Sequence, residues 1–202
     1  MKPVYFDHAA TTPLAPEALE AMRPYFCGAY GNPSSLHSFG RSARKGCAQG
    51  REQLASLLGA DPSELFFTSG GSESDNWALK GLAWANCSRG RHIVTTAIEH
   101  HAVLHSCDWL EQQGFEVTRL PVDADGRVDP AVVAAALRKD TILVSIMTAN
   151  NEVGTLEPIE EVGAMLRERG ILFHTDAVQA VGHIPLDMHQ LPIDALSLSG
   201  HK

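Results

Sequence analysis

Three short polar segments contain the side chains that could carry chemistry. An apolar strand is predicted to run into the turn 199–202, Ser-Gly-His-Lys, which ends in a single lysine. A second predicted strand ends near Asp176, and Gln179 follows three residues later. A third leads into the glycine-rich turn 69–73, Ser-Gly-Gly-Ser-Glu. A lysine for a Schiff base, a carboxylate for a pyridinium nitrogen and a glycine-rich turn for a phosphate are the parts of a pyridoxal phosphate (PLP) site.

The glycine-rich turn allows two interpretations. Its backbone N–H groups could approach a phosphate, which would also face the positive N-terminus of the following helix. Alternatively, it is a tight strand-to-helix turn in which Ser72 caps the helix and Glu73 lies in the first turn. The segment matches neither GxGxxG nor GxxxxGK[ST], which disfavours a dinucleotide or P-loop nucleotide site.

The other candidate side chains also have structural alternatives. A carboxylate at Asp176 needs a partner if its strand is buried, and a ring nitrogen is one such partner. Asp176 could instead cap a helix, with Gln179 completing a capping box. Asn151 could donate to a cofactor or belong to a simple turn. His100 could stack on a pyridine ring and move protons, or be an ordinary loop histidine.

The pattern of apolar residues predicts the elements that must position these side chains. Helices are expected at 16–26, 38–58, 72–85, 102–113, 130–138 and 158–169, and strands at 65–68, 92–96, 115–120, 141–147, 171–175 and 195–198. Short strands that alternate with helices predict an α/β fold with a mostly parallel sheet. In such sheets ligands bind beyond the carboxyl ends of the strands, where the polar segments lie. Residues 1–60 lack strong strand signals and are expected to wrap around the sheet as an arm.

Composition limits the classes of protein and partner. The chain has 202 residues, of which 44% are hydrophobic and 20% charged, as in ordinary globular domains. A net charge of −8 argues against nucleic acid or an anionic membrane as a partner. The sequence has no run of 18 apolar residues and no apolar signal-peptide core, so a cytoplasmic location is expected. The four cysteines (Cys27, Cys47, Cys87 and Cys107) form no CxxC pair; they are expected to be structural, and no metal site is predicted.

Taken together, the polar segments resemble the N-terminal half of cysteine desulfurases of the NifS/IscS type, class V aminotransferase-like PLP enzymes of fold type I. The matching stretches run in the order typical of that family: 5–13, 31–37, 68–74, 99–100, 150–154, 174–179 and 199–202. The resemblance implies a three-layer α/β/α PLP-binding large domain at 16–202, which would be incomplete, and an N-terminal arm at 1–15. It also implies a small C-terminal domain that this chain does not contain.

The resemblance assigns roles to individual residues. Lys202 would hold PLP covalently and then move the substrate α-proton, assisted by His100, which would stack on the ring. Asp176 would pair with the ring nitrogen and Gln179 with the phenolate oxygen. The other cofactor-binding residues would be Gly71, Ser72, Ser199, Gly200 and His201 at the phosphate, and Asn151 at both cofactor and substrate. Ala10, Thr11 and Asn32 would border the substrate pocket. The family often has threonine at the position of Ser72, and serine keeps the hydroxyl.

The implied reaction takes sulfur from L-cysteine and leaves L-alanine and an enzyme persulfide, for iron–sulfur cluster or thio-cofactor assembly. The implied partners are L-cysteine, a second copy of the chain as a homodimer, and a sulfur-accepting scaffold or carrier protein. In the family, the nucleophilic cysteine and a substrate-binding arginine follow the PLP lysine, so residues 1–202 alone are expected to be inactive. The alternatives are a selenocysteine lyase or another class V PLP lyase, and an inactive fragment or interaction module.

Overall fold

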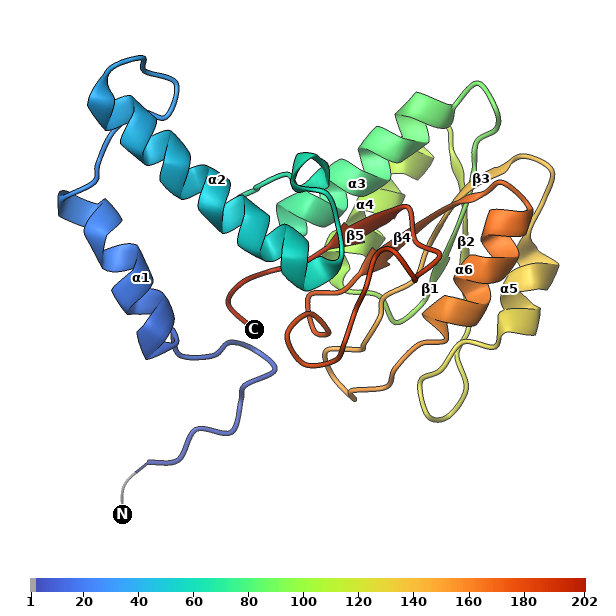
Figure 1. Cartoon of the computed structure of the whole chain (residues 1–202). Helices are drawn as coiled ribbons and strands as arrows, with labels where there is room; N and C mark the ends of the chain where they lie inside the picture. Colours follow the sequence, from blue (N-terminus) through green and yellow to red (C-terminus); the bar gives the residue numbers. More distant parts are fainter. Residues whose placement is uncertain (1–2) are drawn as a thin grey trace.

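The computed structural model describes residues 3–202 and is built around one five-stranded sheet (Figure 1). The strand pairs are parallel, and the strands lie in the order β2-β1-β3-β4-β5. They are β1 (His92–Thr96), β2 (Glu116–Leu120), β3 (Thr141–Ser145), β4 (Leu172–Asp176) and β5 (Ala195–Ser197). Because the strands are parallel, their carboxyl ends meet at one edge of the sheet.

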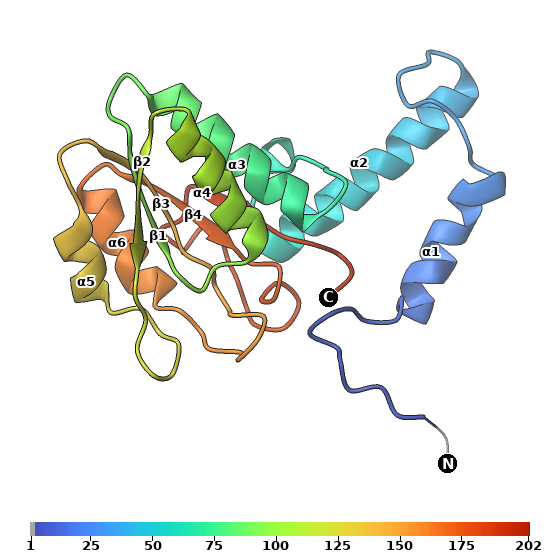
Figure 2. The same ribbon diagram turned by 180° about the vertical axis from the view of Figure 1, so that it is seen from behind.

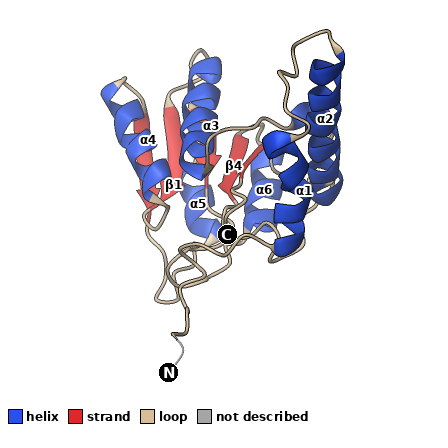
Figure 3. Cartoon of the chain, turned by 90° about the vertical axis from the view of Figure 1, so that its left-hand side faces the viewer, coloured by secondary structure: helices blue, strands red, loops and turns tan. Residues whose placement is uncertain are grey.

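Helices cover both faces of the sheet (Figures 2 and 3). The helices α3 and α4 pack on one face, and α5 and α6 pack on the other. Their bounds are α3 (Gly71–Asn86), α4 (His101–Gln112), α5 (Pro130–Ala136) and α6 (Ile159–Glu168). In β1, Ile93 packs toward α3 and α4 whereas Val94 packs toward α5 and α6, as expected when successive side chains alternate across a strand. The predicted three-layer α/β/α architecture with a parallel sheet is therefore confirmed.

The central strands show why this sheet forms. Every residue of β1 and of β3 is buried, which is typical of parallel strands covered by helices on both faces. The helix α6 is followed by Gly170, whose φ of +65° is the left-handed conformation that lets the chain turn back into β4. The sequence patterns placed these elements within about two residues of their observed bounds.

Two expectations for the N-terminal third were wrong. The helices α1 (Pro16–Cys27) and α2 (Ser38–Leu58) stand at one side of the sheet instead of wrapping around it (Figures 1 and 3). The segment 65–68 is not a strand; it follows a short 3-10 helix, η1 (Pro62–Glu64). Phe66 packs edge-on against Trp77, and Phe67 lies under the guanidinium group of Arg51. These aromatic contacts take the place of pairing with a neighbouring strand.

In residues 3–202, no helix has the length and apolar character that crossing a membrane requires.

Candidate active site

A cavity of about 350 Å³ opens at the carboxyl-end edge of the sheet. It brings together most of the side chains that the sequence predicted for one site: Ala10, Gly71, Ser72, His100, Asn151, Asp176, Gln179, Ser199, His201 and Lys202. They come from the N-terminal segment, the start of α3, the start of α4 and the turns after β3, β4 and β5. Volumes of this order are typical of small-molecule sites.

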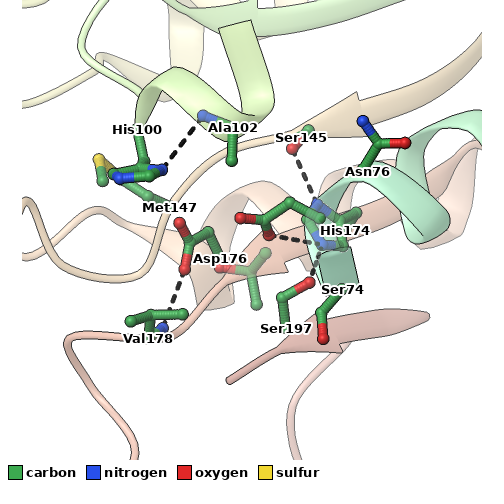
Figure 4. A network of polar contacts seen from close by, with 12 residues as sticks. Ser74, Asn76, His100, Ala102, Ser145, Met147, His174, Asp176, Val178 and Ser197 are labelled. Carbon is green, nitrogen blue, oxygen red and sulfur yellow. Dashed lines mark hydrogen bonds and ion pairs between the residues drawn. The ribbon is translucent and has the colours of Figure 1, made fainter. Parts of the chain in front are cut away.

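Asp176 is the last residue of β4 and lies at the floor of this cavity. Its side chain is buried, and its Oδ1 accepts a hydrogen bond of 2.9 Å from the backbone N–H of Val178 (Figure 4). Burial raises the pKa of Asp176, while the Val178 bond, His100 and Lys202 all act to lower it. Residues 178–180 form a turn and not a helix, so the alternative of Asp176 as a helix cap is wrong. The carboxylate is free to accept a further partner from the cavity.

The N-terminus of α3 forms one wall. Within residues 3–202 no side chain caps this helix; Gly70 occupies the cap position, and Ser72 is the second helical residue. The expectation that Ser72 caps the helix was therefore wrong, although Glu73 does lie in the first turn, where it accepts from the Ser69 N–H at 2.6 Å. An uncapped helix start directs N–H groups and a positive partial charge into the cavity, and such ends bind anions.

Close approach of the backbone at Gly71 depends on the absence of a side chain. A Cβ atom placed there would lie 2.8 Å from Cγ2 of Val178 and 3.7 Å from Cβ of Ser199. The first distance is shorter than real Cβ contacts permit. Glycine therefore lets the start of α3 pack directly against the turns that follow β4 and β5.

The N-terminal segment covers the opposite side of the cavity. Lys202 Nζ donates to the carbonyl oxygen of Ala9 at 2.6 Å, and Gln179 Nε2 donates to the same oxygen at 2.9 Å. The backbone N–H of Thr12 donates to the carbonyl of His201 at 3.0 Å. These contacts fix residues 9–12 beside the lysine turn.

His100 lies at the start of α4 and is exposed at the cavity. Its Nδ1 accepts from the Ala102 N–H at 3.1 Å, which orients the ring. Asn151 lines the cavity, whereas its neighbour Asn150 is buried and organises the turn through bonds to the N–H groups of Glu152 and Val153. The two adjacent asparagines therefore differ in position.

Three predicted residues do not line the cavity. Thr11 and Gly200 are adjacent to lining residues, and the Thr11 hydroxyl lies 3.2 Å from Nδ1 of His201. Asn32 lies in the loop before α2, where its side chain accepts from the Ser34 N–H at 2.9 Å. The structure does not bring Asn32 to this site.

Sequence analysis missed several buried polar groups behind the cavity. Asp75 lines it from the second turn of α3. His174 lies between the Ser145 and Ser197 hydroxyls, at 2.9 and 3.0 Å from its ring nitrogens (Figure 4). Burial lowers the pKa of His174 to about 4, so its ring is neutral. Asp75 could have been suggested by its spacing of four residues from Gly71, which puts both on one face of a helix.

Among the described residues, Asp75, His100 and Asp176 are the one group of side chains whose ligand atoms lie close enough to share a metal ion, within 4.8 Å of one another. They lie at the floor of the cavity that the PLP prediction also uses.

The cysteines were expected to be structural, and this holds clearly for Cys107. It is fully buried, and burial raises the pKa of its thiol to about 12. Cys27 and Cys47 are exposed and Cys87 is partly buried, so a structural role for these three stays a prediction.

The chain is similar in sequence to known proteins over its whole length. The chain is 56% identical over 201 residues to "Cysteine desulfurase IscS" of Methanosarcina thermophila, covering all of this chain and 50% of that protein. It is 55% identical over 202 residues to "Putative cysteine desulfurase IscS 1" of Bacillus subtilis, covering 53% of that protein. The chain thus spans about half the length of the curated relatives it matches.

Solved structures show the same fold. A "NIFS-LIKE PROTEIN" superposes with a TM-score of 0.95 at 44% identity, over 98% of this chain and 55% of that one. "SspA in complex with cysteine" gives a TM-score of 0.94 at 45% identity, over 98% of this chain and 57% of that one. The family described as Aminotransferase class-V matches residues 4–202. The chain therefore belongs to the class V aminotransferase family, and its architecture is that of the fold type I cysteine desulfurases.

Proposed function

We propose that this chain provides the PLP site of a cysteine desulfurase. The observation that carries the proposal is the convergence of Lys202, Asp176 and the uncapped start of α3 on one cavity. The relatives named above, and the neighbour whose structure contains cysteine, support the same activity. The proposed partners are L-cysteine, a second copy of the chain and a sulfur-accepting protein, and the proposed location is the cytoplasm.

The side chains at the cavity fit PLP. The α3 N-terminus, Ser72, Ser199 and His201 offer donors for a phosphate, and Gly71 allows the backbone to approach it. The buried Asp176 carboxylate makes only one hydrogen bond within the described residues, and a protonated ring nitrogen would satisfy its other oxygen. Lys202 supplies the amine to which the cofactor would be attached, and Gln179 and Asn151 supply amide donors beside it.

Bound PLP supplies an electron sink for the α-carbon of an amino acid. Lys202 is the proposed base at the α-carbon of the substrate, because its amine lies in the same cavity as Asp176. His100 is the proposed stacking group and second proton carrier, held in orientation by its bond to Ala102. Asp176 would keep the ring nitrogen protonated, and a protonated ring withdraws electrons from the α-carbon more strongly.

Sulfur transfer requires a nucleophilic thiol. Among the described residues no cysteine lines the cavity, and the Cys107 thiol is buried and held protonated by its raised pKa. We therefore assign the sulfur-accepting role to a cysteine outside these residues. The products are L-alanine and a persulfide on that cysteine.

The test is turnover of L-cysteine by the protein purified together with the segment that supplies the sulfur-accepting cysteine, and reconstituted with PLP. We expect equal amounts of alanine and transferred sulfur, loss of both with Lys202→Ala, and retention of both with Lys139→Ala, a matched variant at an exposed lysine outside the cavity. Turnover of L-selenocysteine with no reaction of L-cysteine would identify a selenocysteine lyase instead. Unchanged turnover in Lys202→Ala would contradict the proposal.

A further inference from the structure

A second carboxyl group lies beside Asp176 at the floor of the cavity. Asp75, on α3, is only 1% exposed, and its Oδ1 has no hydrogen-bond partner among the described residues. The ligand atoms of Asp75 and Asp176 lie within 4.8 Å of each other. Oδ1 of Asp75 also lies 3.8 Å from Nε2 of the neutral His174. The cofactor roles assigned above leave this group without a function.

Two buried carboxylates at this separation are costly to ionise together, because each negative charge disfavours the other where water is excluded. Burial and, to a lesser degree, the neighbouring Asp176 raise the pKa of Asp75, a hydrogen bond from Ser197 partly offsets the rise, and the resulting pKa is about 7. The pair therefore retains one proton below about pH 7.

The surroundings decide which carboxyl group holds this proton. Asp176 accepts the Val178 N–H, and the side chains of His100 and Lys202 favour its ionised form. Asp75 instead faces the neutral ring of His174 and the Ser197 hydroxyl. Glu99, the other buried acidic group nearby, has a pKa raised to about 8 by burial and adds no negative charge below that pH. The acidic side chains of Asp7 and Glu152 also line the cavity but are exposed to solvent. The proton accordingly belongs on Asp75.

We propose that Asp75 is a positioning residue that holds one proton beside Asp176, so that Asp176 alone presents a negative charge to the ring nitrogen of the cofactor. This inference rests on the proposed PLP site. Its first consequence, a protonated Asp75 in the protein without cofactor, can be tested independently of that site.

The first experiment is thermal unfolding of the cofactor-free protein at pH 5 and pH 8.5. Folding raises the pKa of Asp75 from 3.8 to about 7, so the native state binds the extra proton and loses stability as pH rises through that window. Asp75→Asn mimics the protonated side chain. We expect it to match the parent melting temperature at pH 5 and to exceed it by several degrees at pH 8.5, whereas Asp125→Asn at an exposed turn shifts neither.

A melting temperature lowered equally at both pH values by Asp75→Asn would overturn the inference. If this variant does not fold, the parent protein labelled with ¹³C at the aspartate carboxyl carbons gives the answer. One carboxyl resonance should remain protonated at pH 6, and its absence would also overturn the inference.

The second experiment follows the cofactor by NMR of PLP labelled with ¹⁵N in the ring. We expect the ring nitrogen to be protonated in the parent and in Asp75→Asn at pH 7, and unprotonated in Asp176→Asn. Loss of the ring proton in Asp75→Asn would show that the ionised form of Asp75 is needed to protonate the ring nitrogen, which would contradict the proposal. If the parent binds no PLP, the proposed function fails, and the unfolding experiment still decides the protonation of Asp75.

Discussion

Single residues at this site derive their properties from their place at the ends of strands. Asp176 is buried because it ends a strand covered on both faces, and it remains available because its backbone partner uses one oxygen. His174, two residues earlier in the same strand, points into the layer of Ser145 and Ser197 and stays neutral. The Asp176 carboxylate therefore lies at the floor of the cavity, and the neutral His174 ring lies behind it.

Asp176→Asn tests whether the negative charge of the Asp176 carboxylate is needed for the reaction. An amide keeps the shape of the side chain but cannot stabilise a protonated ring nitrogen. We expect PLP to be retained and alanine formation to slow by about 10²–10³-fold. The measurement is alanine release at saturating L-cysteine and equal PLP content. Release at the parent rate would show that Asp176 serves only the turn at Val178.

The sequence predicted the candidate site residues that lie at the ends of strands, because the carboxyl ends of parallel strands meet at one edge of the sheet. Its one hint of Asp75 was the spacing of four residues from Gly71, because a carboxylate inside a helix is normally on the solvent face. The burial of Asp75 depends on how closely α3 packs against β4 and β5, which no local pattern reveals. Asn32 shows the opposite error: its motif matched, but the loop that contains it lies elsewhere.

Among the elements, α3 links the fold most directly to the site. Its first turn faces the cavity, and its later turns pack in the core through Leu79 and Ala83. Because α3 contributes to both the cavity and the core, substitutions in its first turn should change cofactor affinity, and substitutions further along it should change the stability of the fold.

Two glycines in α3 make this separation measurable. Gly71→Ala places a Cβ 2.8 Å from Val178, and we expect PLP affinity to fall by about tenfold or more as the turn shifts. Gly81→Ala is the matched control, because its Cβ meets only ordinary contacts with Trp77 at 3.7 Å. It should leave PLP affinity unchanged and stabilise the protein by about 0.5–1 kcal/mol. Equal affinities for the two variants would contradict the role given to the α3 N-terminus.

Glu99 links the ends of β1 and β3. Its Oε1 accepts from the Thr96 hydroxyl at 2.6 Å and from the Met147 N–H at 3.1 Å. Burial raises its pKa from 4.5 to about 8, so the native state binds a proton that the unfolded state releases. Stability is therefore lost as pH rises from about 4.5 to 8.

Glu99→Gln should remove this dependence while keeping the accepting oxygen. We expect unchanged stability at pH 5 and higher stability than the parent at pH 9, measured by urea unfolding. A variant that is less stable at pH 9 would show that the ionised carboxylate is needed at this junction.

Sequence patterns predicted some strands correctly and failed for one segment. Buried runs such as β1 and β3 could be predicted, because a strand covered on both faces is rich in β-branched residues and does not alternate between apolar and charged ones. The segment 65–68 is also mostly apolar but is not a strand, since Phe66 and Phe67 are exposed and contact Trp77 and Arg51. Strand formation needs a partner edge, which composition alone does not supply.

For the whole molecule, the exposed apolar side chains of the N-terminal third are the main unexplained surface. Phe6 and Leu36 are 89% and 83% exposed, and Phe66 and Trp77 add an aromatic patch near α2. Exposed apolar surface of this kind marks interaction sites. We take it as support for the proposed homodimer.

Analytical ultracentrifugation of the holoprotein tests the dimer. We expect a dimer for the parent and weaker self-association for Phe66→Ser, since a buried aromatic contact would be lost. Lys139→Ala, at an exposed position away from the patch, serves as the control. A monomeric parent, or a Phe66→Ser variant that associates as strongly as the parent, would contradict this assignment.

Lys202 is the residue proposed to hold PLP, in the cavity formed with Asp176 and the start of α3. Borohydride reduction of the PLP-loaded protein, followed by peptide mapping, tests it most directly, because reduction fixes the cofactor to the lysine that holds it. We expect a pyridoxyl group on Lys202. A label on Lys45, Lys80 or Lys139 and none on Lys202 would contradict it.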